Sequence, residues 1–235
     1  MPTGRKSRIP QTRTDKVHAG LRQAILEQRL APGARLPEDA IGDSFGTSRT
    51  IAREALGRLA MEGLVDLVPN RGAFVANPSL DEGRHIFAVR KGLERLVVQQ
   101  LAAQMTPDLA GALQAMTDAE RKVLAKSEAE AIRLAGEFHL KLAELTGNPL
   151  LARYVRELVS RCSLVLAMYG RPHSAECGAE EHRTLVAALV AGDRDRAAAL
   201  MDQHLDLVAG RALIAPEQLG DVRTILSDFL RETSD

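Results

Sequence analysis

Three histidines in the second half of the chain, His139, His182 and His204, have side chains that could bind a metal ion or an anion. His182 and His204 each stand in a row of apolar residues at helical spacing, which turns their imidazoles toward the protein interior. A buried imidazole needs a partner for both ring nitrogens, and two of them side by side favour a shared metal ion or anion. The alternative is two separate core histidines, each bonded to polar groups of the helices.

The turn at Gly192-Asp193 relates His182 to His204. The numbers 182 and 204 average to 193, so the two residues are equidistant from this turn. In an antiparallel helical hairpin they lie at one level, about 15 Å from the turn at a rise of about 1.5 Å per residue. His139 precedes a break at Gly147-Asn148-Pro149, and it joins the other two only if tertiary packing brings its helix close.

A second group of polar residues lies between Gly46 and Leu56. Ser48 suits the N-cap of a helix that begins with polar side chains and continues with an apolar inner face. Arg49 and Arg53 are four residues apart and share one face of this helix. Arginine is suited to guanine edges, and hydroxyls and backbone amides at a helix start are suited to phosphate. The alternative is an ordinary charged, solvated helix.

The elements around this helix favour DNA binding. The pattern predicts three helices, at residues 14–28, 38–45 and 48–62. Two apolar runs, residues 64–68 and 73–76, flank Pro69-Asn70-Arg71-Gly72 and predict a hairpin with Arg71 at its exposed tip. A supporting helix, a helix-turn-helix and a hairpin wing together predict a winged helix-turn-helix.

From residue 80 onward the chain shows helical periodicity without a strand signal. Breaks at proline and glycine divide it into six or seven helices, the last covering residues 216–235. Because aromatic residues make up only 3% of the chain, its core must consist of Leu, Val, Ala and Met, as is ordinary in a helical bundle. We expect a mainly α protein: a winged helix-turn-helix of three helices plus a β-hairpin at residues 10–78, then an all-α bundle of six or seven helices at residues 79–235.

The composition favours a cytoplasmic protein. The chain has 235 residues, no apolar run near the roughly 18 residues of a membrane helix, and a polar, basic start unlike a signal peptide.

The two parts of the chain differ in net charge. Residues 1–78 carry 12 Lys and Arg against 8 Asp and Glu, and residues 79–235 carry 19 against 23, so the net charges are +4 and −4. The basic arm in the first sixteen residues suits either DNA phosphates or solvent. Cys162 and Cys177 are expected to be free thiols.

The first part of the chain contains a long, ordered series of motifs: Pro32-Gly33-Ala34-Arg35-Leu36-Pro37-Glu38, Ser48-Arg49-Thr50 to Arg53-Glu54-Ala55-Leu56, Leu59-Ala60 to Glu62-Gly63-Leu64-Val65, and Asn70-Arg71-Gly72-Ala73-Phe74-Val75. In these motifs the chain resembles the GntR family of bacterial regulators. The resemblance implies that operator phosphates or bases are contacted by Arg35, Ser48, Arg49, Thr50 and Arg53, and that Arg71 and Gly72 place the wing near the minor groove. Many members have proline and valine after Ser-Arg-Thr, whereas this chain has Ile51 and Ala52, a departure that removes no contacting group.

The second part of the chain contains the motifs Phe138-His139, Gly147-Asn148-Pro149-Leu150, Glu181-His182, and Gly192-Asp193 to His204-Leu205. With these motifs, roughly residues 80–213 resemble the FCD ligand domain of the FadR-type GntR branch. Members of this branch often bind a divalent metal through three histidines and an aspartate four residues before the first, and organic acids are frequent effectors. Here Ala135 stands at the aspartate position. The resemblance implies a zinc or nickel site of His139, His182 and His204 that a carboxylate effector or water completes. The alternative is a metal-free pocket in which the imidazoles bind the effector directly.

Three further residues are candidates for effector binding. The resemblance implies that Arg90 and Glu94, four residues apart, face the cavity, where Arg90 would hold a carboxylate in a bidentate pair. A salt bridge on the protein surface is the alternative for this spacing. Arg133, six residues before His139, is a third candidate of the same type.

Together these features predict a ligand-responsive transcription regulator, a repressor or an activator, that binds double-stranded operator DNA as a homodimer and responds to a small organic acid. A metal-dependent, hydrolase-like enzyme using the three histidines is the rival prediction. It would need a general base, and the sequence has neither HExxH spacing nor a Ser or Cys nucleophile motif. A plain architectural DNA-binding protein would leave about 150 residues of helical sequence unexplained.

Overall fold

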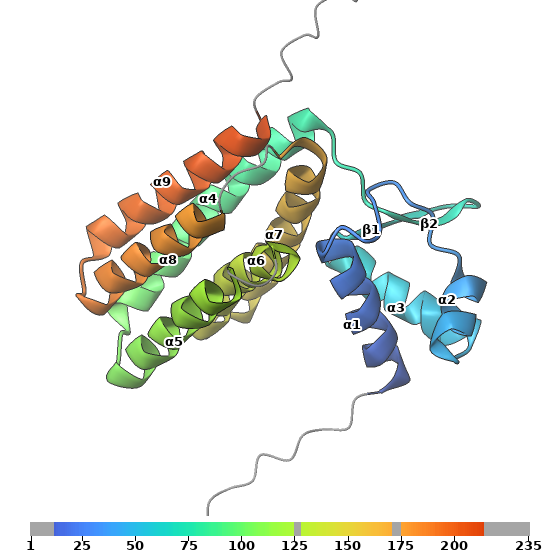
Figure 1. The fold of residues 1–235 in the computed structure, drawn as a ribbon, viewed down its shortest axis with the longest axis horizontal. Coiled ribbons are helices and arrows are strands. Elements are labelled where there is room, and N and C mark those ends of the chain that lie inside the picture. The colour runs from blue at the N-terminus through green and yellow to red at the C-terminus, as the bar shows by residue number, and fades with distance from the viewer. Residues whose placement is uncertain (1–11, 125–127, 171–174, 214–235) are drawn as a thin grey trace, which may run out of the picture.

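The structure is a computed structural model that describes residues 12–124, 128–170 and 175–213. Its N-terminal domain consists of α1 (Arg13–Leu26), α2 (Glu38–Phe45), α3 (Arg49–Met61), β1 (Val65–Val68) and β2 (Gly72–Val75). Its helical domain consists of α4 (Leu80–Ala103), α5 (Pro107–Leu124), α6 (Glu128–Leu145), α7 (Pro149–Tyr169), α8 (Ala175–Val190) and α9 (Arg194–Leu213). The two lie side by side (Figure 1). The predicted mainly α fold, with a winged helix-turn-helix ahead of a bundle, is confirmed.

Local sequence explains the helices of the N-terminal domain. Thr12 and Asp15 form a capping box at the start of α1, which satisfies two backbone amides there. Gly46 ends α2 in the left-handed conformation at φ 58°, where glycine carries no steric cost. Ser48 then caps α3, because its hydroxyl accepts a hydrogen bond from the Ile51 amide. These caps fix the tight turn between the two helices of the helix-turn-helix.

The wing is a two-stranded antiparallel hairpin. Val65 pairs with Val75 and Val68 with Gly72. Asn70 (φ 60°) and Gly72 (φ 100°) supply the positive φ angles that the turn requires. Arg71 is exposed at the tip, as predicted.

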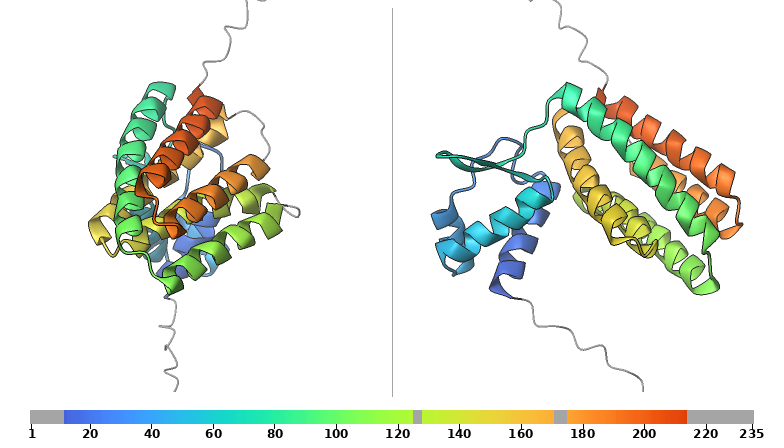
Figure 2. Two further views of the ribbon diagram at one scale, coloured as in Figure 1. Left: turned by 90° about the vertical axis from the view of Figure 1, so that its left-hand side faces the viewer. Right: turned by 180° about the vertical axis from the view of Figure 1, so that it is seen from behind.

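The helical domain has one main apolar core, and α7 connects it to the N-terminal domain. Helix α4 packs along α9 and α7, and α8 and α9 pack against each other. Helix α7 faces the N-terminal domain, with α9 on the far side of the bundle (Figure 2). Leu164 of α7 belongs to the apolar cluster of the N-terminal domain.

Two predicted features lie outside the described residues: most of the basic arm, and the last helix at residues 216–235.

Candidate metal centre and DNA-reading face

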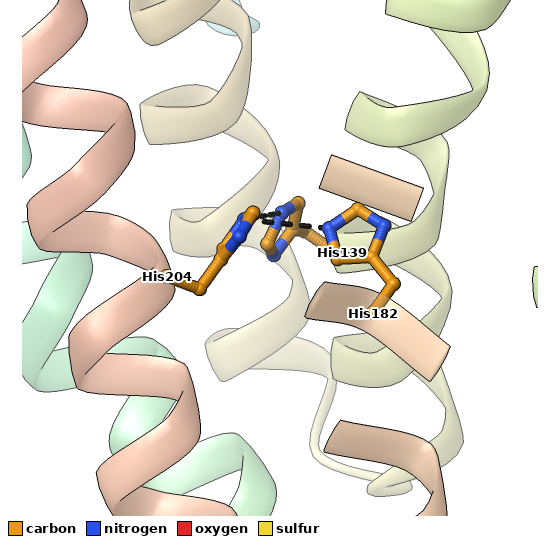
Figure 3. Close-up of side chains that lie close together, drawn as sticks. All are labelled: His139, His182 and His204. Atoms are coloured by element: carbon orange, nitrogen blue, oxygen red, sulfur yellow. Dashed lines mark hydrogen bonds between the residues drawn. The ribbon is translucent and has the colours of Figure 1, made fainter. Parts of the chain in front are cut away.

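The three predicted histidines lie together in the interior of the helical domain. His139 comes from α6, His182 from α8 and His204 from α9, with 3%, 1% and 5% of each residue exposed. Their Nε2 atoms converge, at 3.3 Å between His182 and His204 and 3.2 Å between His204 and His139 (Figure 3). The hairpin of α8 and α9 thus brings His182 level with His204, and packing of α6 brings His139 to them.

Each imidazole also contacts a glutamate of another helix through Nδ1, the ring nitrogen that does not face the other two histidines. The Nδ1 contacts are 2.5 Å for His139 with Glu94, 2.9 Å for His182 with Glu120, and 2.6 Å for His204 with Glu181. Because a carboxylate accepts hydrogen bonds, each Nδ1 donates its proton, and in a neutral imidazole the lone pair is then on Nε2, which faces the other two rings. Sequence reasoning missed Glu120, which no spacing relates to His182, and it gave no role to Glu181, although Glu181 adjoins His182 in the chain.

Burial keeps the imidazoles of His139 and His204 neutral. Desolvation lowers the pKa of His139 to about 3, even though Glu94 opposes that change. Desolvation also lowers the pKa of His204 against the opposing effect of Glu181. The Phe138 ring stacks on the His182 imidazole with centroids 4.0 Å apart and holds its orientation. The site is therefore a cluster of three fixed lone pairs in the protein interior.

The donor set fits a divalent metal of the zinc or nickel type. Three imidazole nitrogens lie within 4.8 Å of one another, and a glutamate is bound to the other nitrogen of each ring, as is usual for metal-binding histidines. Within the described part of the chain no carboxylate oxygen joins this group of ligand atoms. Ala135 stands where the resemblance placed an aspartate ligand. Three protein ligands leave open positions for water or an exogenous oxygen ligand.

Arg90 and Glu94 form an ion pair in the interior rather than on the surface. Arg90 Nε donates to Glu94 Oε1 at 2.5 Å, with the two side chains 4% and 1% exposed. The surface salt bridge considered for this spacing is therefore wrong. Burial alone would raise the pKa of Glu94, but Arg90 and His139 hold it below its usual range. Arg90 also contacts the buried Cys162 thiol on α7.

Arg133 lies apart from the Arg90 pair. Its Nη1 donates to Glu137 at 2.7 Å on the same helix. It lines a cleft of about 850 Å³ between the two domains. Glu120 and Phe138 line the same cleft, so its wall is the outer side of the residues that hold His182.

The side chains predicted to contact DNA are exposed on the N-terminal domain. Arg49 and Arg53 on α3 have side chains 60% and 65% exposed, and Ser48 and Thr50 are exposed beside them. Arg35 is also exposed, and it forms a backbone bridge to Phe74 of the wing. Sequence reasoning missed Glu38 of α2, whose carboxylate contacts both Arg49 and Arg53.

Comparison with known proteins decides the family. A model described as bacterial regulatory proteins, gntR family, matches residues 13–75, and the FCD domain model matches residues 85–207. The chain belongs to the GntR family, in its FadR-type branch with an FCD domain. GntR regulators bind operator DNA, so the family match favours a bacterial transcription regulator over a hydrolase-like enzyme.

Relatives and solved structures agree with this assignment. The chain is 25% identical to the HTH-type transcriptional repressor RspR of Escherichia coli strain K12, over 92% of this chain and 93% of the relative. It is 28% identical to the Uxu operon regulator of Haemophilus influenzae, over 80% and 77%. The structure of McbR/YncC of E. coli matches with a TM-score of 0.72 and 25% identity, over 85% of this chain and 98% of that one. In the described part of this chain, no helix is long and apolar enough to cross a membrane.

Proposed function

We propose that this GntR regulator is a cytoplasmic repressor whose affinity for its operator is controlled by a small organic acid. Residues 10–78 bind the operator, and residues 79–235 bind the effector and form a homodimer. The acid binds in the helical domain and completes a zinc or nickel site made by His139, His182 and His204. The repressor assignment is supported by the similarity to RspR, which is itself named as a repressor.

The observation that carries this proposal is the convergence of three Nε2 atoms, each on an imidazole whose Nδ1 is held by a glutamate. The Nε2 atom of His204 lies 3.3 Å from that of His182 and 3.2 Å from that of His139, and lone pairs at such distances repel one another unless a cation lies between them. A bound zinc or nickel ion would supply a Lewis acid with an open position for a carboxylate oxygen.

The charges around the cluster also suit an acidic effector. The surroundings of the three imidazoles contain three carboxylates, of Glu94, Glu120 and Glu181, and two guanidinium groups, of Arg90 and Arg211. Three negative and two positive charges sum to −1. A divalent cation would change this sum to +1, and one effector carboxylate would then neutralise it. Neutrality matters here because uncompensated charge in a protein interior is costly.

A chain of contacts offers a route from this cluster to the DNA-binding domain. His139 is bound by Glu94, Glu94 by Arg90, and Arg90 contacts Cys162 of α7. The neighbouring Leu164 of α7 packs into the N-terminal core. A shift of Glu94 on effector binding would therefore be transmitted to the helix on which the DNA-binding domain rests.

Dimerisation would place two recognition helices on successive turns of a pseudo-palindromic operator. We place the contact between subunits in the helical domain. Its outer surface supports this, because Val89 and Leu96 of α4 are 55% and 40% exposed.

The test is an operator-release titration. The protein first selects its operator from a randomised duplex pool, and binding is then measured by fluorescence anisotropy with zinc, with nickel and after chelation. A panel of small mono- and dicarboxylates is added to each sample. We expect at least one acid to weaken operator binding by about fivefold or more in the metal-loaded protein, within the usual range of allosteric coupling.

Two results would contradict the proposal. If none of the acids alters operator affinity in the loaded protein, control by an organic acid fails. If an acid acts equally after chelation, the metal has no part in the response, and direct binding by the histidines replaces it.

A further inference from the structure

Glu38, the first residue of α2, holds both arginines of the recognition helix. Its Oε1 accepts a hydrogen bond from Arg53 Nε at 2.8 Å, and its Oε2 accepts from Arg53 Nη2 at 2.9 Å and from Arg49 Nε at 2.7 Å. The Glu38 side chain is only 22% exposed, whereas both arginine side chains are mostly exposed. One carboxylate thus fixes two long side chains at the surface expected to face DNA.

Glu38 engages the Nε side of each guanidinium group. The bidentate contact of an arginine with guanine O6 and N7 requires two donors on one guanidinium edge. With the Nε side taken by Glu38, the edge formed by the two terminal nitrogens remains for such a contact. Asp39 is a looser neighbour, with Oδ2 at 3.6 Å from Arg49 Nη1. The arrangement orders the two arginines without using up the edges that read a base.

Without this carboxylate the two arginines would behave differently. They are four residues apart on one helix face and repel each other. As mobile cations they would contact phosphates of any sequence as readily as the bases of one sequence. Hydrogen bonds from Arg53 and Arg49 lower the pKa of Glu38 to about 2, so its charge is present at neutral pH.

We propose that Glu38 is a positioning residue that sets the sequence specificity of this regulator. It orients Arg49 and Arg53 toward guanine edges and keeps them from pairing freely with phosphates. This inference rests on the proposed contact of the two arginines with operator DNA. It adds that an acidic residue, which by itself repels DNA, improves discrimination between sequences.

The test compares the full-length wild type with three variants: Glu38→Gln, Glu38→Asp and Asp43→Asn. Affinity is measured over a salt series for two probes, the duplex that the wild type selects from a randomised pool and a random-sequence duplex of the same length. Asp43 is a matched control, because it is exposed on the same helix and no ion pair of its side chain occurs among the described residues. Thermal unfolding checks that each variant is folded.

For Glu38→Gln we expect the ratio of the two affinities to fall by about tenfold or more, the size of one bidentate base contact. The loss should come mainly from tighter and more salt-dependent binding to the random duplex. Glu38→Asp keeps the negative charge, but its side chain is one methylene shorter and cannot contact both arginines in the same way. It should therefore also lower the ratio of the two affinities. Asp43→Asn should strengthen binding to both probes alike and leave the ratio unchanged.

If Glu38→Gln changes the ratio no more than Asp43→Asn does, Glu38 acts only as a charge and the inference is overturned. Arg49→Ala and Arg53→Ala separate this failure from failure of the proposed DNA contacts. If both arginine variants bind the selected duplex as the wild type does, the proposed contacts themselves are wrong. If they bind weakly while Glu38→Gln keeps its specificity, only the inference about Glu38 fails.

Discussion

The buried ion pair beside the histidines gives a sharp stability prediction for Glu94→Gln. Glu94 is 1% exposed and accepts hydrogen bonds from Arg90 Nε and His139 Nδ1. Glutamine has the same shape, but it is neutral, and its amide group would face one of these two donors. The change therefore leaves the Arg90 guanidinium buried without a counter-charge. Removing one partner of a buried pair costs about 3–5 kcal/mol, which corresponds to a fall in Tm of roughly 6–20 °C in a chain of this size.

Glu144→Gln is the matched control. Glu144 also pairs with an arginine, Arg156, at 2.8 Å, but its side chain is 42% exposed, so its loss should cost no more than about 1 kcal/mol. Both variants are compared with the wild type by calorimetry in the presence of a chelator, so that metal binding does not contribute. Adding Arg90→Met to Glu94→Gln removes the stranded charge and should recover part of the lost stability. Equal losses in Glu94→Gln and Glu144→Gln would refute the reasoning, as would further destabilisation by Arg90→Met.

Two other predictions concern the N-terminal domain and its contact with α7. Leu164→Ala should lower the free energy of unfolding, measured in urea, by about 2–5 kcal/mol, because Leu164 is 1% exposed in the N-terminal core. The control Leu207→Ala, at a residue that is 43% exposed, should lower it far less. Similar losses in the two variants would contradict the packing described. For Glu62, burial alone would raise the pKa, but His18 and Arg22 lower it below 4.5. Since the folded pKa lies below the unfolded one, Glu62 stabilises the fold above about pH 4.5, and this contribution is lost as pH falls through the folded pKa. The difference in unfolding free energy between the wild type and Glu62→Gln should therefore shrink from pH 6 to pH 3.5, and a constant difference would contradict the assignment.

Local sequence predicted the elements of the N-terminal domain well, because caps and turns are local. Ser48, Gly46 and Asn70 each act within a few residues of their position. The sequence predicts that the first helix starts at residue 14, whereas α1 begins at Arg13, because Thr12 caps it in a capping box with Asp15. Helix rise alone also predicted that two of the histidines meet across the α8–α9 turn.

Contacts between distant segments could not be predicted in the same way. Glu120 precedes His182 by 62 residues, and only the packing of α5 against α8 brings them together. The spacing of Arg90 and Glu94 predicted a pair, but a four-residue spacing carries no information about burial. Glu38 reaches Arg49 and Arg53 across the turn of the helix-turn-helix, a contact that depends on the angle between α2 and α3.

Metal content measured on purified protein tests the central claim most directly. The wild type, His182→Ala, His204→Ala and the control His85→Ala, an exposed histidine of α4, are loaded with zinc or nickel, desalted and analysed for metal per chain. We predict close to one ion per chain in the wild type and in His85→Ala, and a large loss in both cluster variants. A wild type that retains no metal after loading, or cluster variants that retain as much as the wild type, would contradict the three-histidine centre.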